Sequence, residues 1–286
     1  MKNNFTKGKA NRVTLAERMK KYEAVTTGTT LIERLPIYAR IDMRAGHTWC
    51  KDLIKPFDQD YCNAMKVATS YIVEKTGAVV GYCQSDEASF IWLDSSKTPF
   101  ETRLFKLQSI LSSMFTAAFI KACVNTKLWN KIDNGKLPSF DCRVCNMPSL
   151  DEAANMILWR EQDSIKNSIT LLALEHFSNK EIHKKNSNDK IQMLADKGVD
   201  YYKVIPEDLR NGAYFRRELY NKVLTEDELS KIPKHNWPKP NATGQYTVIR
   251  SKVVQFNFGC KLQVLSNKVD ALFYGVKPIQ IETDII

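Results

Sequence analysis

Two aspartates stand where a folded chain can bring carboxylates together. Asp42 ends a strand-like run over residues 35–42, and Asp86 lies in the polar tip 84–87 between two further strand-like runs. Apposed carboxylates repel each other unless a cation neutralises them, and hard oxygen ligands select Mg²⁺. Two such ions activate an attacking hydroxyl and stabilise a leaving oxygen in phosphoryl or nucleotidyl transfer. If these strands are neighbours in one sheet, the sequence predicts a magnesium site with that chemistry.

The elements around the aspartates follow the order strand, helix and acid-tipped hairpin, which is the plan of a polymerase palm. Asp58 is a suitable N-cap for a helix whose apolar residues recur at three- and four-residue steps, and Gly77 ends it. The runs 79–83 and 88–93 then predict a β-hairpin. Acids at strand ends are also ordinary turn residues, so spacing alone leaves a purely structural interpretation open.

Further along, the sequence predicts a helix that begins at Thr98 and Pro99, a strand over 139–147, and a long helix from Ser149 towards Phe177. Polar residues form a stripe along the long helix at three- and four-residue steps: Arg160, Asp163, Asn167 and Thr170. A solvated helix face is the default explanation for such a stripe.

These patterns predict an α+β fold with a palm-like antiparallel sheet flanked by helices and a helical and β C-terminal extension. Residues 1–25 are expected to form a basic arm and a helix, which begins at a capping box of Thr14 and Glu17. The palm-like catalytic domain is expected over 26–178. The C-terminal region, 179–286, is expected to contain helices, a Pro-rich linker near residues 233 to 240 and a β-like segment from 245 to 265.

The charge of the chain is placed at its ends. The 286 residues include 42 Lys and Arg against 32 Asp and Glu, a formal charge of +10. Residues 1–24 hold seven basic residues against two acids, and residues 231–286 hold eight against three. Basic ends suit a polyanion such as nucleic acid, although a solvated surface explains them equally well.

The composition favours a cytoplasmic protein without a membrane segment. No run approaches the roughly 20 apolar residues that span a bilayer, and no apolar segment follows the basic N-terminus as in a secretory signal. Seven scattered cysteines suit reduced thiols better than a disulfide framework.

Several motifs carry a resemblance to a known family. Five segments, in chain order, resemble the tRNA-His guanylyltransferase family: RIDMRAGHTW, KPFD, YCQSDEASF, FDCRV and WREQDSIKNSI. Three others resemble its bacterial and archaeal branch, the tRNA-His guanylyltransferase-like proteins: TLAERMKKYE, HFSNKEIHKKN and LRNGAYFRR. The resemblance covers about residues 14–217 and is specific because separate motifs agree.

The resemblance implies an enzyme that adds nucleotides to the 5′ end of tRNA, in the 3′–5′ direction. The family activates a 5′-monophosphate with ATP or GTP, and the 3′-hydroxyl of an incoming nucleoside triphosphate then attacks the activated phosphate. Eukaryotic members carry His-Ile-Asn-Asn where this chain has Ile-Lys-Asn-Ser, which favours the like-protein branch with its templated repair of 5′-truncated tRNA. The family also implies two Mg²⁺ ions and a homotetramer.

By the same resemblance, Asp42 and Asp86 are the catalytic metal ligands, joined by the backbone carbonyl of Met43. The family usually has Gly at that position. A carbonyl ligand survives the change, but the Met43 side chain occupies space that glycine leaves open. His47 follows in the same motif, yet a lone His is more often structural, and metal activation of the hydroxyl makes a His base unnecessary.

Basic residues are assigned to phosphates in the same way. Arg40 and Lys55 match family positions that handle nucleotide phosphates, where a fixed positive charge stabilises the developing charge. Arg103 and Lys106 stand in the place of the family's basic helix. Lys190 corresponds to a phosphate-contacting lysine. As surface charges, Arg103 and Lys106 would be unremarkable.

The remaining nucleotide-binding assignments are polar or acidic. Ser85 and Glu87 flank Asp86, and Glu87 is expected to support it from beside the metal site. Asp163 and Asn167 match the helix motif that faces the nucleotide in this family, which gives the polar stripe a purpose.

Two other functions stay open from sequence. A palm-type nucleotide cyclase would share the two aspartates and Mg²⁺, although its hairpin would typically carry paired glycines where this tip reads CQSDEAS. A catalytically silent RNA-binding protein would use the basic ends alone, and intact Asp42, Asp86 and Lys55 weigh against it. A cyclase needs no RNA, and ATP-dependent labelling of an RNA 5′ end would exclude the silent protein.

Overall fold

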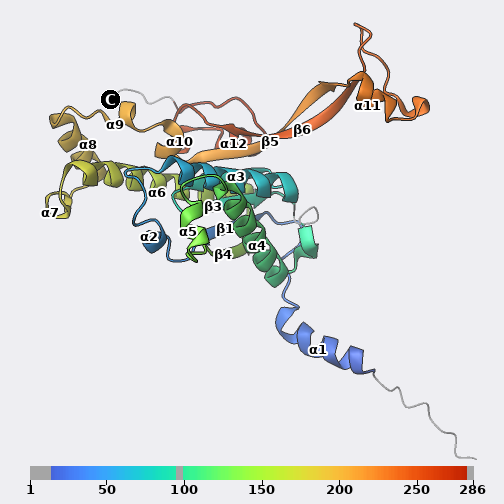
Figure 1. Cartoon of the computed structure of the whole chain (residues 1–286), viewed down its shortest axis with the longest axis horizontal. Helices are drawn as coiled ribbons and strands as arrows, with labels where there is room; N and C mark the ends of the chain where they lie inside the picture. Colours follow the sequence, from blue (N-terminus) through green and yellow to red (C-terminus); the bar gives the residue numbers. More distant parts are fainter. Residues whose placement is uncertain (1–13, 95–98, 282–286) are drawn as a thin grey trace, which may run out of the picture.

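The computed structural model of the chain describes residues 14–94 and 99–281. At its centre lies a six-stranded antiparallel sheet in the order β4-β1-β3-β2-β5-β6 (Figure 1). The strands are β1 (Ile37–Met43), β2 (Val80–Gln84), β3 (Glu87–Trp92), β4 (Phe140–Asn146), β5 (Ala213–Val223) and β6 (Thr247–Phe256). The predicted α+β class is confirmed. The basic arm predicted before Thr14 lies outside the described residues.

Helices cover both faces of the sheet. α3 (Gln59–Thr76) and α4 (Leu104–Cys123) pack on one face, and α6 (Leu150–His176) packs on the other. The shorter helices are α1 (Leu15–Thr27), α2 (Gly46–Trp49), α5 (Trp129–Asp133), α7 (Asn179–Ile182), α8 (Ser187–Asp196), α9 (Tyr201–Val204), α10 (Glu207–Arg210), α11 (Glu226–Ser230) and α12 (Lys268–Phe273). Three 3-10 turns are η2 (Pro99–Thr102), η3 (Lys234–Asn236) and η4 (Leu262–Val264). None of the helices in the described part of the chain is long and apolar enough to cross a membrane.

Alternation along β1 decides which residues enter the core. Successive side chains of a strand point to opposite faces, and Ile37, Ile41 and Met43 join the buried core with α3 and α4. Tyr38 belongs to the second core, beneath α6. Asp42 shares the parity of Tyr38, so its carboxylate belongs to the α6 side of the sheet.

Local capping signals place α3 as the sequence predicts. The Asp58 carboxylate accepts a hydrogen bond from the Tyr61 N–H at 3.1 Å, which satisfies one free donor of the first turn. Gly77 ends the helix with φ of +71°, a left-handed conformation in which glycine meets no Cβ penalty. The predicted capping box of Thr14 and Glu17 at the start of α1 is also present.

The hairpin is tighter than predicted, because only Ser85 and Asp86 form its turn. Gln84 and Glu87, which the sequence interpretation placed in the tip, are paired residues at the ends of β2 and β3. Both are buried. The buried Glu87 carboxylate pairs with the Arg160 guanidinium on α6, so a charged residue is tolerated inside the strand.

The C-terminal region extends the same sheet. β5 was not predicted as a strand, yet it pairs with β2, and β6 pairs with β5 along ten residue pairs. The far half of this two-stranded arm projects away from the body and carries α11 at its end (Figure 1). After β6, η4 and α12 return to pack beside α6.

A buried carboxylate fastens this return to α6. Glu161 is 1% exposed and accepts hydrogen bonds from the Tyr214 hydroxyl at 3.0 Å and the Leu262 N–H at 2.8 Å. Burial raises the pKa of Glu161 to about 7, against an ordinary value of 4.5, although both hydrogen bonds lower it. The carboxyl group therefore holds a proton in the folded protein at a pH where the unfolded chain has released it.

We expect this group to make stability depend on pH. A raised folded pKa contributes stability that is fully present below pH 4.5 and is lost as the pH rises through about 7. Glu161→Gln cannot ionise, so its free energy of unfolding should fall less across that window. Urea denaturation of both proteins from about pH 5 to pH 8 measures the difference. Parallel pH profiles for the two proteins would contradict the assignment.

Candidate active site

The end of β1 and the β2–β3 turn bring the two predicted metal ligands to one corner of the sheet. Asp42 pairs with Glu87 in the antiparallel register, and the Met43 N–H donates to the Asp86 carbonyl at 3.0 Å. Both aspartates are partly exposed. Burial raises the pKa of Asp42, and the neighbouring carboxylates of Asp86, Glu87 and Asp141 raise it further.

This chemistry fits a hard divalent cation. The Asp86 carboxylate lies close enough to disfavour ionisation of Asp42, and a cation would relieve that repulsion. No group of three or more His, Cys, Asp and Glu side chains suited to a metal occurs within residues 14–94 and 99–281. A two-carboxylate site of this kind suits Mg²⁺, which keeps several waters and takes few protein ligands.

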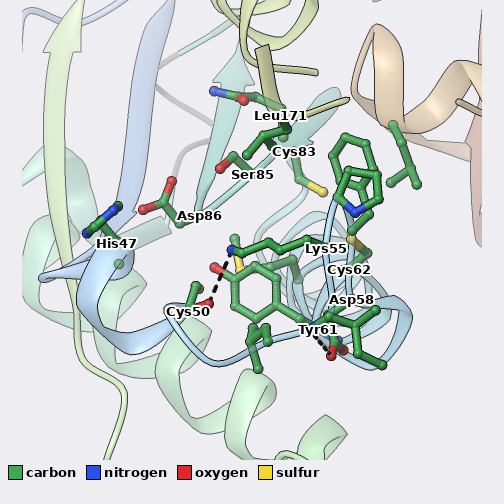
Figure 2. Close-up of a pocket in the computed structure, with 18 of the residues that line it drawn as sticks. His47, Cys50, Lys55, Asp58, Tyr61, Cys62, Cys83, Ser85, Asp86 and Leu171 are labelled. Atoms are coloured by element: carbon green, nitrogen blue, oxygen red, sulfur yellow. Dashed lines mark hydrogen bonds between the residues drawn. The ribbon is translucent and has the colours of Figure 1, made fainter. Parts of the chain in front are cut away.

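A cavity of about 340 Å³ adjoins Asp86. Figure 2 shows Asp86, Ser85 and His47 on one side and Asp58, Tyr61 and Cys62 on the other. Most of the remaining lining is apolar, and Leu171 of α6 contributes to it. The volume lies within the range of about 300–1,000 Å³ that is usual for small-molecule sites.

Lys55 supplies a positive charge inside the cavity. Its side chain extends across the space, and Nζ donates to the Cys50 carbonyl at 3.4 Å (Figure 2). The loop that carries it is held by Asp58, which accepts hydrogen bonds from the N–H groups of Ile54 at 3.2 Å and Tyr61 at 3.1 Å. Asp58 thus both caps α3 and holds the loop that carries Lys55.

Gly46 is a site residue that the sequence interpretation missed. A Cβ built on Gly46 would lie 1.9 Å from Oδ2 of Asp86 and 2.9 Å from Cγ of the same side chain. The backbone at the start of α2 therefore approaches the carboxylate more closely than any other residue type allows. The glycine in RAG was a visible signal, but the partner that makes it necessary lies in a distant turn.

Met43 is accommodated on the opposite face from Asp42. Its side chain is 2% exposed, lies in the core with α3 and α4, and accepts a weak contact from the Tyr61 hydroxyl, with 4.0 Å between oxygen and Sδ. The side chain that replaces the family's usual glycine thus fills core space, while the Asp42 carboxylate keeps the α6 side.

Glu87 is engaged by α6. Arg160 Nε donates to Glu87 Oε1 at 2.5 Å, and Arg160 Nη2 donates to Asp163 Oδ2 at 2.8 Å. Glu87 and Arg160 are both buried. Glu87 therefore joins the turn that carries Asp86 to the long helix, and Asp163 belongs to the same network.

The other predicted residues are distributed around this corner. Arg40 lies two residues before Asp42, and its guanidinium carbon is 5.5 Å from the centre of the Trp159 ring. Asn167 is exposed on α6, and Lys190 Nζ donates to the Thr170 hydroxyl at 3.0 Å. Lys190 thus lies against the same helix, toward its C-terminal end.

Arg103 and Lys106 lie at the other end of the sheet. They belong to the start of α4, whose C-terminal half approaches the site, because the Phe119 and Phe140 rings are 5.3 Å apart and Phe140 pairs with Met43. A helix rises 1.5 Å per residue, so about 24 Å separates Arg103 from Phe119 along its axis. One chain alone does not bring these two cations to the cavity.

Comparison with known proteins matches this arrangement. The family model described as "Thg1: tRNAHis guanylyltransferase" matches residues 16–148. The tRNA(His) guanylyltransferase of Schizosaccharomyces pombe is 30% identical over 215 residues, which are 71% of this chain and 80% of that protein. This chain belongs to the tRNA(His) guanylyltransferase family. Members of this family are nucleotidyltransferases.

Solved structures agree with the family. A bacterial tRNA(His) guanylyltransferase (Thg1)-like protein in complex with ATP is 33% identical, with a TM-score of 0.62, and the match covers 72% of this chain and 87% of that one. Such a protein in complex with GTP is 28% identical with a TM-score of 0.60, over 84% of this chain and 89% of the other. The family fold therefore extends beyond the residues matched by the family model.

The close approach at Gly46 yields a test of the site geometry. Gly46→Ala keeps an accessible backbone conformation but forces the Asp86 carboxylate to move, because the added Cβ would overlap Oδ2. We expect kcat for nucleotidyl transfer to fall at least about tenfold, as for other small misplacements of reacting groups. The melting temperature should change little. Gly135→Ala is the control for activity: it adds a methyl group where nothing lies within 4 Å, so kcat should not change, while its φ of +82° should lower the melting temperature. Full activity of Gly46→Ala would exclude the close packing.

Proposed function

We propose that this protein is a 3′–5′ nucleotidyltransferase that extends the 5′ end of tRNA. The observation that carries the proposal is the meeting of Asp42 and Asp86 at one corner of an antiparallel sheet, beside a cavity that contains Lys55. Acids, a cation and a cavity of small-molecule size are what phosphoryl chemistry on a nucleotide requires.

The reaction has two steps. In the first, an oxygen of the RNA 5′-monophosphate attacks the α-phosphorus of ATP or GTP, a 5′-to-5′ anhydride forms, and pyrophosphate leaves. In the second, the 3′-hydroxyl of an incoming nucleoside triphosphate attacks the RNA 5′-phosphorus. The anhydride bond breaks, AMP or GMP leaves, and the new 5′ nucleotide retains its triphosphate.

The residues of the corner divide these tasks. We assign two Mg²⁺ ions to Asp42, Asp86 and the Met43 carbonyl, where, when bound, they would activate the attacking oxygen and stabilise the leaving one. Lys55 and Ser85 line the cavity and are assigned to nucleotide phosphates. In the cavity, Lys55 would neutralise charge that develops on the transferred phosphoryl group.

Side chains of α6 and α8 complete the nucleotide site. We assign Asp163, Asn167 and Lys190 to it, and Glu87 to holding the turn. The hydrogen bonds from Arg160 to Glu87 and Asp163 support a common frame for these groups. Arg40, on the same face as Asp42, is assigned to a phosphate.

The natural substrate is proposed to be a tRNA whose 5′ end is incomplete. The similarity to bacterial Thg1-like proteins supports the templated repair branch, alongside guanylate addition to tRNA-His. We further propose a homotetramer in the cytoplasm. An assembly in which RNA contacts more than one subunit would give Arg103 and Lys106 a role that one chain does not provide.

A direct assay separates the alternatives. Purified protein is incubated with Mg²⁺, ATP, GTP and two 5′-monophosphorylated tRNAs, one full-length tRNA-His and one lacking its first nucleotide, and the 5′ ends are sequenced. We expect extension of the truncated tRNA that follows the opposing template base. Extension of tRNA-His alone would restrict the activity to guanylate addition. A cyclic nucleotide formed without RNA, or no product at all, would contradict the proposal in favour of the cyclase or the silent RNA-binding protein.

The metal assignment has its own test. Asp42→Asn and Asp86→Asn each remove one ligand charge at a partly exposed position, so transfer should fall at least about a hundredfold while the fold persists. Mg²⁺ should raise the melting temperature of the unmodified protein and not of the variants. Without metal, Asp42→Asn should be at least as stable, because repulsion from the neighbouring carboxylates is relieved.

Asp133→Asn is the matched control for these variants, because Asp133 is an exposed carboxylate on α5 and does not line the cavity. It should keep both the activity and the Mg²⁺-dependent shift. Transfer at the unmodified rate in either ligand variant would reject the assignment.

A further inference from the structure

A basic and aromatic surface lies beside Asp42, on the α6 side of the sheet. Its members are Arg40 of β1, Arg143 of β4 and Trp159 of α6, which we call the Arg–Trp surface. Arg40 and Arg143 are register partners in neighbouring strands, so their side chains leave the same face. Arg40 has the parity of Asp42, two residues earlier in β1. The surface is therefore adjacent to one of the two catalytic carboxylates.

Trp159 contacts two arginines and is about half exposed. Its exposed fraction is 48%, so part of its large apolar ring reaches the surface. The Arg160 guanidinium carbon is 4.3 Å from the ring centre, and Arg160 itself is 5% exposed. Since Arg160 is also fixed by Glu87 and Asp163, the tryptophan rests on a rigid, buried base. The Arg40 guanidinium carbon is 5.5 Å from the same ring centre, and the exposed part of the ring is accessible to a ligand.

The two other arginines offer charge to that ligand. Arg40 Nε is buried and, among the described residues, has no hydrogen-bond partner. Arg143 is exposed, and its contact with the equally exposed Asp141 is 3.8 Å long, a weak surface pair. Unlike Arg160, neither arginine forms an ion pair with a buried carboxylate. Donors of this kind bind phosphate oxygens.

We propose that the Arg–Trp surface holds the 5′ end of the RNA substrate, with a terminal base stacked on Trp159 and a nearby phosphate on Arg40 and Arg143. Stacking on aromatic rings and guanidinium planes, combined with cations for the backbone, is how proteins bind exposed RNA bases. The inference rests on the proposed function, because it identifies this ligand as the tRNA end that is extended.

The position of the surface favours RNA over a free nucleotide. The cavity with Lys55 is lined by Tyr61 and Met65, which belong to the core on the α3 side of the sheet. A nucleoside triphosphate can enter there and reach Asp86. The second substrate must reach the same carboxylates without overlapping the first, and the Arg–Trp surface is the approach next to Asp42. A base beside a phosphate is common to both ligands, so the test must separate them.

The experiment uses a tRNA that carries the fluorescent base 2-aminopurine as its first nucleotide and a 5′-monophosphate. Stacking on Trp159 should quench this base when protein is added without any nucleoside triphosphate. Trp159→Ala should lose the quench and bind the RNA at least about fivefold more weakly, the lower end of what one stacked base contributes. Trp159→Phe keeps an aromatic ring and should retain most of both signals.

Matched variants and a second ligand sharpen the result. Trp129→Ala removes another partly exposed tryptophan, 37% exposed on α5, and should leave the quench unchanged. Arg143→Gln, on an exposed strand position, should reduce the salt dependence of RNA binding by about one counterion, even if Trp159→Ala fails to fold. KM for ATP should stay within about twofold in all variants.

Three further outcomes would show whether the Arg–Trp surface binds the RNA end. If Trp159→Ala folds and keeps the quench, the stacking role is wrong. If 2-aminopurine riboside triphosphate, rather than the RNA, loses its quench in that variant, the surface binds the nucleotide and the proposal is overturned. If the unmodified protein quenches the RNA base but transfers no nucleotide, the proposed enzymatic function fails while RNA binding at this surface stands.

Discussion

The pairing register between β1 and β3 determines which side of the sheet carries the chemistry. Asp42 lies opposite Glu87, and Ile41 lies opposite Ala88. A slip of one residue would turn Asp42 into the core beneath α3 and α4 and would expose Ile41. Burying an unpaired carboxylate there would cost several kcal/mol, in addition to the lost apolar burial. The apolar alternation that builds the core thus also delivers the two aspartates to one corner.

The buried pair of Glu87 and Arg160 then fixes that corner relative to α6. Both side chains are less than one-tenth exposed, and removing one partner of such a pair typically costs about 3–5 kcal/mol because the other charge is left uncompensated. The ion pair thus links the turn with Asp86 to the polar stripe of α6 and to Trp159. Under the proposed function, this ion pair would keep the Asp86 turn in place while two substrates approach the same carboxylates.

Sequence patterns predicted the elements whose signals are local. The Asp58 cap and the Gly77 stop both act within one turn of the helix they bound, so they were readable without the fold. Glu87 was expected to support Asp86 but was placed in the hairpin tip, because its partner Arg160 lies 73 residues away. Gly46 was overlooked for the same reason, since only the folded turn brings Asp86 against it. β5 was missed because exposed apolar residues such as Leu219 blur the alternation in its outer half.

Hydrogen bonding separates the acids that can bind metal from those that build the frame. Glu87, Asp58 and Glu161 each accept hydrogen bonds that occupy their oxygens. Within the described chain, Asp42 and Asp86 accept no side-chain hydrogen bond or ion pair, although cations stand nearby on both sides. A carboxylate with free lone pairs beside others of its kind is costly unless a metal completes it. The fold places two such carboxylates at one corner, and under the proposed function the same pair of aspartates governs both stability without metal and chemistry with it.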